Sequence, residues 1–126
     1  MITLHHFTHP QWFEAKGAFE KQENISYFVR FCARMFEALC DKVQLWCTIN
    51  EPGPYVFQGY MHAAFPPGRK NPHLAAQVLK NMLIAHTQVY KKLKSLPGGK
   101  EAQIGLVHQY LPFEAHSWNP LEMVVG

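Results

Sequence analysis

The sequence predicts an α/β fold in which strand, helix, strand, helix and strand follow one another, with the strands parallel. Short apolar runs alternate with two long segments whose apolar residues recur at three- and four-residue spacing. The segments that follow the strands are long, whereas those that follow the helices are short. Strands that alternate with helices, with short connections from each helix to the next strand, are typical of parallel strands joined by right-handed crossovers.

The first half of the chain contains two expected strands and one helix. Residues 2–7 are rich in β-branched and apolar types and predict a strand, and residues 9–23 then predict a loop. Asn24 is suited to cap a helix that ends near Cys40. Residues 43–49 have almost no polar interruption, which is typical of a parallel strand buried on both faces.

The second half begins with residues 52–70, which contain four prolines and three glycines and predict a long loop. Asn71 followed by Pro72 predicts the start of a second amphipathic helix, which ends at residues 97–99. Residues 103–108 predict the third strand, and the tail over residues 112–126 is expected to be irregular.

The composition favours a single globular domain and excludes several kinds of partner. The chain has 126 residues and a formal net charge of +3. Its densest basic cluster, Lys91, Lys92 and Lys94, lies where cations complement a helix dipole, so nucleic-acid binding is not expected. No apolar run reaches the length of a membrane span. Three cysteines without a CxxC pair predict reduced thiols and a cytoplasmic location.

The run TINEP, residues 48–52, places a glutamate at the end of the second expected strand. Long loops at the carboxyl ends of parallel strands mark the functional face of barrels and open sheets. Glu51 can therefore serve as a general acid there. An exposed loop carboxylate before a proline is the plainer alternative, and spacing alone leaves both interpretations open.

The cluster of His5, His6 and His9 suggests a metal site at first sight. In a strand, His5 and His6 point to opposite faces, and no cysteine or carboxylate completes a ligand set. We therefore expect no metal and no cofactor.

Several segments together resemble glycoside hydrolase family 1, the β-glucosidase family. The run LWCTINEP resembles the acid/base signature of that family, which is usually written W-x-T-x-N-E-P. TLHHFTHPQW is similar to the family's segment at the end of its third strand, and KGAFEKQENISYFVRFCARMFEAL to its third helix. Ala85-His86 and IGLV at residues 104–107 resemble its fourth helix and fifth strand. The resemblance implies that residues 1–126 are part of a family 1 catalytic domain, covering about strands three to five of a (β/α)8 TIM barrel.

The same resemblance implies roles for three residues. Glu51 matches the general acid/base of a retaining enzyme, which protonates the glycosidic oxygen and later deprotonates the attacking water. Asn50 matches the amide that hydrogen-bonds the 2-hydroxyl of the sugar, and His6 matches a histidine that contacts a glycone hydroxyl. Trp46 is expected to pack in the core. Cys40 departs from the glycine that the family usually has before the aspartate, which calls a left-handed helix cap there into question.

The family's nucleophile has no counterpart in this chain. It is a second glutamate in an I/V-T-E-N-G run, and no such run occurs here; Glu114 is a weak substitute. A retaining glycosidase needs two carboxyl groups about 5–5.5 Å apart. A barrel needs about 250 residues, and Met1 falls inside the first strand motif. We therefore expect a β-glucosidase-like fragment that acts on a β-linked sugar only with the missing strands.

Two alternatives remain open at this stage. The chain can be a non-catalytic carbohydrate-binding remnant, or an assembly element that completes a barrel with another chain. Three parallel strands leave two open edges, which favour a complementing chain or self-association.

Overall fold

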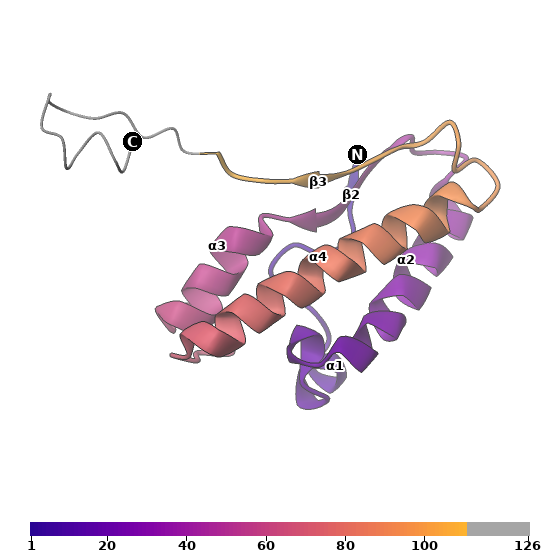
Figure 1. The fold of residues 1–126 in the computed structure, drawn as a ribbon. Helices are drawn as coiled ribbons and strands as arrows, with labels where there is room; N and C mark the ends of the chain where they lie inside the picture. Colours follow the sequence, from indigo (N-terminus) through magenta and orange to yellow (C-terminus); the bar gives the residue numbers. More distant parts are fainter. Residues whose placement is uncertain (111–126) are drawn as a thin grey trace, which may run out of the picture.

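The computed structural model describes residues 1–110, in which a three-stranded sheet is covered on one side by two long helices (Figure 1). The elements are β1 (Ile2–Thr3), α1 (Gln11–Ala15), α2 (Ile25–Leu39), β2 (Leu45–Asn50), α3 (Pro52–Val56), α4 (Pro72–Lys94) and β3 (Gln103–Val107). Two 3-10 turns (Ala18–Glu20 and Gln22–Asn24) and one π-helical turn (Phe57–Met61) lie between them. The tail over residues 112–126, expected to be irregular, lies outside the described residues.

The sheet has the sequential order β1-β2-β3 with both pairings parallel. Trp46 at the centre pairs with Ile2 on one side and with Ile104 on the other. Helices α2 and α4 pack against each other on the same side of this sheet (Figure 1). The prediction of parallel strands joined by helical crossovers is confirmed.

The core lies between the sheet and the two helices. Trp46 is buried and its ring packs on Phe36 of α2, with 4.9 Å between ring centroids. Its indole N–H donates to the carbonyl of Val43 at 2.9 Å, so the ring is satisfied within the fold. Ile49 from β2 and Val78 from α4 are fully buried in the same cluster. The expectation that Trp46 packs in the core is confirmed.

β1 and β2 differ from their predicted ranges, and β3 ends one residue earlier than predicted. β1 ends at Thr3, and the chain turns farther on at Phe7, whose φ is +66°. The pairing nevertheless extends past its end, since the Leu4 N–H donates to the Cys47 carbonyl at 2.8 Å. β2 starts at Leu45, which is 45% exposed, and only from Trp46 to Ile49 is the strand buried as predicted.

Two segments expected to be loops contain helical structure. Residues 9–23 form α1 and the two 3-10 turns, and residues 52–70 begin with α3 and the π-helical turn. Proline is tolerated in the first turn of a helix, where its missing N–H has no intrahelical partner. Pro52 and Pro54 therefore begin a helix here and do not prevent one.

The two long helices start where the sequence predicts, but only one of them is capped as expected. The Asn71 side chain accepts from the Leu74 N–H at 3.1 Å and caps α4 as expected. Asn24 does not cap α2; its side-chain N–H group donates to the carbonyls of Lys16 and Ala18. Cys40 has right-handed helical angles, so no left-handed cap forms at this position.

Candidate active site at the carboxyl edge of the sheet

Strand β2 delivers Asn50 and Glu51 to the carboxyl edge of the sheet, between its two neighbours. The Asn50 N–H donates to the carbonyl of His5 at 2.9 Å, and the Glu51 N–H donates to the carbonyl of Val107 at 2.8 Å. His6 follows His5 directly. The structure thus brings the backbones of all three expected site residues to one edge, with His6 exposed and Asn50 and Glu51 half-buried.

The backbone of Glu51 has an unusual conformation. Its φ of +43° and ψ of 64° lie in the left-handed region, which costs a non-glycine residue about 1–2 kcal/mol. Glu51 also starts α3, because its carbonyl accepts from the Tyr55 N–H at 3.1 Å. Its two backbone groups are therefore held by β3 and by α3. Strain of this kind persists only where the surroundings enforce it, and it gathers at functional sites.

A polar contact in the core supports the strand behind the site. The buried hydroxyl of Thr48 donates to the Gly105 carbonyl at 3.1 Å and accepts from Nδ1 of His86 at 2.7 Å. This contact joins β2, β3 and α4. Burial lowers the pKa of His86, so its imidazole stays neutral and donates one N–H. Sequence reasoning noted Ala85-His86 only as a resemblance and did not identify this pair.

Aromatic side chains form one wall beside the site. Phe7 stacks on Tyr55, with 6.3 Å between ring centroids, and meets Phe65 at 5.8 Å. Burial raises the pKa of Tyr55 to about 12, and the pKa of the fully buried Tyr60 is raised as well. Both phenols are therefore neutral. Phe57 and Phe65 leave aromatic surface exposed on the segment after Glu51.

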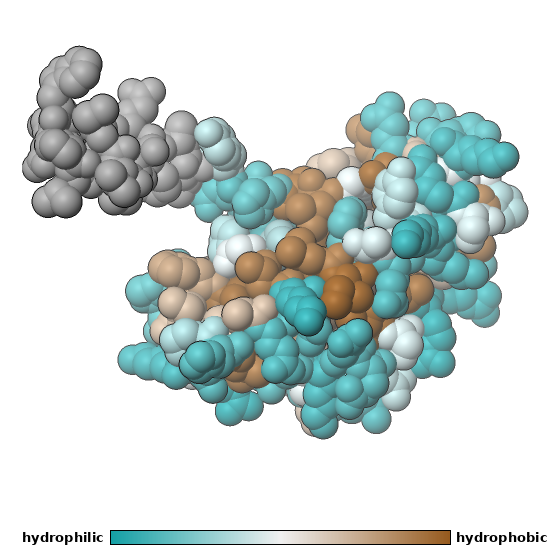
Figure 2. Space-filling model, viewed as in Figure 1, coloured by the Kyte–Doolittle hydropathy of each residue, from teal (hydrophilic) through white to brown (hydrophobic). Residues whose placement is uncertain are grey.

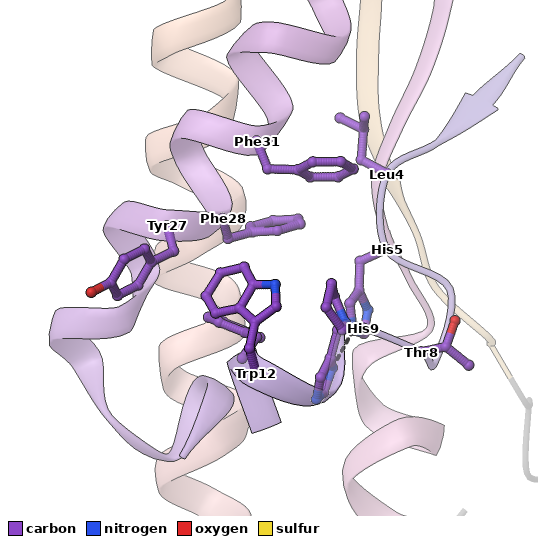
Figure 3. A pocket seen from close by; sticks show the side chains of 10 residues that line it. Leu4, His5, Thr8, His9, Trp12, Tyr27, Phe28 and Phe31 are labelled. Carbon is purple, nitrogen blue, oxygen red and sulfur yellow. Dashed lines mark hydrogen bonds between the residues drawn. The ribbon is translucent and has the colours of Figure 1, made fainter. Parts of the chain in front are cut away.

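Two histidine rings, those of His5 and His9, lie against each other in the segment that follows β1 (Figure 3). His5 is buried, and its Nε2 lies 3.4 Å from Nδ1 of His9. Nε2 of His9 donates to a carboxylate oxygen of Glu14 at 2.7 Å. Burial, followed by the nearby His9 and His6, lowers the pKa of His5 to about 3. His5 points inward and His6 is exposed, which confirms that these neighbours face opposite sides.

Other features of the described chain bear on the sequence expectations. Across residues 1–110, no group of three or more His, Cys, Asp or Glu side chains could hold a metal ion. Cys32, Cys40 and Cys47 are free thiols, and burial raises the pKa of Cys32. No helix within the described part is both long enough and apolar enough to span a membrane. Glu114, the weak candidate for a second carboxylate, lies outside these residues.

Comparison with known proteins links the chain to one family. Residues 1–124 match the family model of glycosyl hydrolase family 1. A 6-phospho-beta-galactosidase from Clostridium acetobutylicum is 41% identical over 108 residues, which cover 85% of this chain and 22% of that protein. A 6-phospho-beta-galactosidase from Streptococcus mutans is 36% identical over 110 residues, with the same coverage.

Solved structures show the same likeness. A beta-glycosidase from Pyrococcus horikoshii matches with a TM-score of 0.78 and 38% identity, over 86% of this chain and 24% of that one. A beta-glucosidase from Thermotoga maritima in complex with glucoimidazole matches with a TM-score of 0.92 and 26% identity, over 98% of this chain and 28% of that one. The chain thus spans about a quarter of the length of these relatives.

Proposed function

The chain belongs to glycosyl hydrolase family 1, and from this premise we propose that it is the part of a retaining β-glycosidase that carries the general acid/base, Glu51. The observation that supports this role is the position of Glu51. It follows the central strand, lies at the carboxyl edge of the sheet and has a strained backbone held by β3 and α3. A carboxylate presented so rigidly suits a proton transfer that depends on geometry.

In the proposed mechanism, Glu51 protonates the glycosidic oxygen as the bond to the leaving group breaks. After a glycosyl-enzyme intermediate has formed on a second carboxylate, Glu51 removes a proton from the attacking water. Asn50 donates from its amide to the 2-hydroxyl, a contact that strengthens in the transition state. His6 contacts another sugar hydroxyl from the turn that follows β1.

The second carboxylate must come from outside the run TINEP, and we propose that it belongs to strands this chain does not contain. In this proposal, residues 1–126 contribute strands three to five of an eight-stranded barrel as a partial catalytic domain. The sequential parallel sheet with both helices on one side supports this arrangement. A complementing chain would then supply the remaining strands and the nucleophile. The three free cysteines support a cytoplasmic location as part of the same proposal.

The proposed substrate is a β-linked sugar, and the relatives suggest two kinds. The curated relatives are named as 6-phospho-beta-galactosidases, and several solved structures are beta-glucosidases. An assay of this protein should therefore include a β-glucoside and a 6-phospho-β-galactoside.

The experiment compares the chain alone, the chain with a complementing protein that holds the missing strands, and the complemented Glu51→Gln variant. Substrates are cellobiose, nitrophenyl glucoside and nitrophenyl 6-phosphogalactoside. The chain alone should show no meaningful turnover. Glu51→Gln keeps the shape but removes the proton, so turnover of cellobiose should fall by roughly 10²–10⁴-fold. The loss should be smaller on nitrophenyl substrates, because their leaving groups need little protonation.

The matched control is Glu23→Gln, at an exposed glutamate in the 3-10 turn that precedes α2. This variant should behave as the unsubstituted chain does. Robust turnover by the chain alone would contradict the need for a second carboxylate elsewhere. An unchanged rate on cellobiose after Glu51→Gln would contradict the role of Glu51.

A structural role is the second candidate, because the chain leaves apolar surface uncovered. Figure 2 shows apolar side chains gathered over α4, where Leu79, Leu83 and Ile84 line a groove. Strands β1 and β3 each have a free edge in the described sheet. A barrel-completing element would bury these surfaces in an assembly, whereas a carbohydrate-binding remnant would function without a partner. Sedimentation of the chain with and without the complementing protein separates the two.

A further inference from the structure

The turn that carries His6 is closed by two stacked histidine rings. His5 precedes the turn and His9 ends it, with 5.7 Å between their ring centroids and 24° between their planes. Within the turn lie the exposed His6 and the left-handed Phe7, whose φ is +66°. A non-glycine residue in this conformation costs about 1–2 kcal/mol, so other contacts must hold the turn.

Both ends of this turn are anchored to other elements. The ring of His5 meets Phe19, Phe28 and Tyr55 edge to face, at centroid distances of 5.3, 6.1 and 5.5 Å. Its carbonyl accepts from the Asn50 N–H. At the other end, His9 donates to Glu14 of α1 at 2.7 Å. Glu14, His9 and His5 therefore form a continuous chain of side chains from α1 to the segment that is bonded to Asn50, and Figure 3 shows the two histidines of this chain.

We propose that His9 and Glu14 are positioning residues that hold the turn bearing His6 by fixing the orientation and the tautomer of His5. This proposal rests on the proposed role of His6 as a sugar contact. Glu14 and His9 touch no reacting atom; they act through His5, whose carbonyl and neighbouring residue lie at the site.

The tautomer of His5 follows from which ring nitrogens of His9 carry a proton. A carboxylate only accepts, so Nε2 of His9 carries a proton. When His9 is neutral its Nδ1 is bare and accepts from Nε2–H of His5, which leaves Nδ1 of His5 bare and without a partner among the described residues. When His9 is protonated, its Nδ1–H donates instead, and His5 must carry its proton on Nδ1. The proton on His9 therefore selects the tautomer of His5.

Other titratable groups around the two rings are few. His6 neighbours His5 in the turn, Glu14 faces His9 from α1, Tyr27 of α2 lines the adjoining pocket, and Tyr55 of α3 meets His5. Glu20 acts on Tyr55 from the 3-10 turn. Because burial lowers the pKa of His5 to about 3, His5 is neutral near neutral pH, and its response to a proton placed on His9 is to move its own proton.

The test uses the full chain labelled with ¹⁵N in its histidines and observed by solid-state NMR, which does not require a monomer. At mildly alkaline pH, His5 and His9 should both carry their proton on Nε2. As the pH is lowered, His5 should move its proton to Nδ1 at the midpoint at which His9 gains its second proton. The amide signals of His6 and Asn50 should shift at the same midpoint.

Substitutions at position 14 should reverse or preserve the direction of the hydrogen bonds that link this position to His9 and His5. Glu14→Lys replaces the acceptor by a donor, so His9 should carry its proton on Nδ1 and His5 should change tautomer, although the introduced ammonium group would not touch His5. Glu14→Gln keeps an acceptor oxygen and should retain the original tautomers. Glu23→Lys, the same charge reversal at an exposed site, should leave both rings unchanged.

Three results would overturn the proposal. They are a proton on Nδ1 of His5 at alkaline pH, a His5 tautomer that does not change through the titration of His9, and amides of His6 and Asn50 that stay still while His5 changes. The pH titration of the unsubstituted chain decides the matter even if Glu14→Lys does not fold. The NMR signals require neither substrate nor nucleophile. A negative NMR result would therefore contradict the positioning role of His9 and Glu14 without bearing on the proposed role of Glu51.

Discussion

Replacing His5 by phenylalanine should remove part of the acid sensitivity of this fold. The imidazole is 3% exposed, and its pKa falls from 6.5 to about 3 because burial penalises the charged form. Between these two pH values the unfolded chain binds a proton that the folded chain does not. Stability therefore rises with pH in this window and is lost as the pH falls below 6.5.

The size of the effect follows from the shift. One pKa unit corresponds to about 1.4 kcal/mol, so protonation of the unfolded His5 at pH 5 lowers the free energy of unfolding by about 2 kcal/mol. At pH 7 the same term is only about 0.2 kcal/mol. Phenylalanine suits a cavity already formed by Phe19, Phe28 and Tyr55, and it cannot titrate.

The assay is urea unfolding of the chain and of His5→Phe at pH 7 and pH 5, at one protein concentration because association shifts apparent stability. The original chain should lose about 2 kcal/mol more than His5→Phe between these pH values. His73→Phe, at an exposed histidine, serves as the control and should retain the full loss. Equal losses in the original chain and in His5→Phe would refute the argument that His5 is buried as a neutral base.

Three further predictions concern stability and association. Thr48→Val removes a buried hydroxyl that bonds both His86 and the Gly105 carbonyl, and it should lower the free energy of unfolding by about 1–3 kcal/mol. Thr87→Val, at an exposed hydroxyl, should cost less, and equal costs would argue against the Thr48–His86 contact. Asn71→Ala removes the cap of α4 and should cost about 1 kcal/mol by urea unfolding; no loss would mean that the capping bond contributes nothing. The chain alone should self-associate in sedimentation experiments, because its sheet edges and the α4 groove are uncovered; a stable monomer would contradict this.

The sequence predicts the long helices and the strand order well, because each depends on a pattern that local residues carry. The apolar faces of α2 and α4 recur with the helical period, and Asn71-Pro72 marks the start of α4 through a cap that the structure retains. Alternation of strands with helices is enough to predict parallel pairing in sequential order.

The sequence could not predict the short elements, because competing interactions decide them. Asn24 has the right chemistry for a cap, yet carbonyls that the preceding turn brings near it bind its amide more directly. The prolines in residues 52–70 suggested a loop, whereas their positions in the first turn of α3 permit a helix. For Asn24, the sequence indicates a capping residue but not the carbonyls that bind its amide. For the prolines, the sequence does not show that they fall in the first turn of a helix.

The sequence names candidate site residues but carries no information about their geometry. A motif at a strand end draws attention to Glu51, Asn50 and His6, but spacing carries no information about φ, and the left-handed backbone of Glu51 could not be read from it. Nor could spacing show that Glu14 meets His9, since an irregular turn joins them. These contacts depend on how the chain is placed in space, and only the structure provides that.

The backbone of the edge also constrains where a second carboxylate can lie. Asn50 is bonded to the strand before it and Glu51 to the strand after it, so Glu51 cannot move toward a distant partner without breaking the Val107 contact. A retaining mechanism needs the two carboxyl groups about 5–5.5 Å apart. Both neighbours of β2 belong to this chain, so in the proposed function the partner carboxylate would reach the same edge from a strand outside the described sheet. This requirement links the catalytic proposal to assembly: a chain that completes the sheet should restore activity only if it also places a carboxylate at that edge.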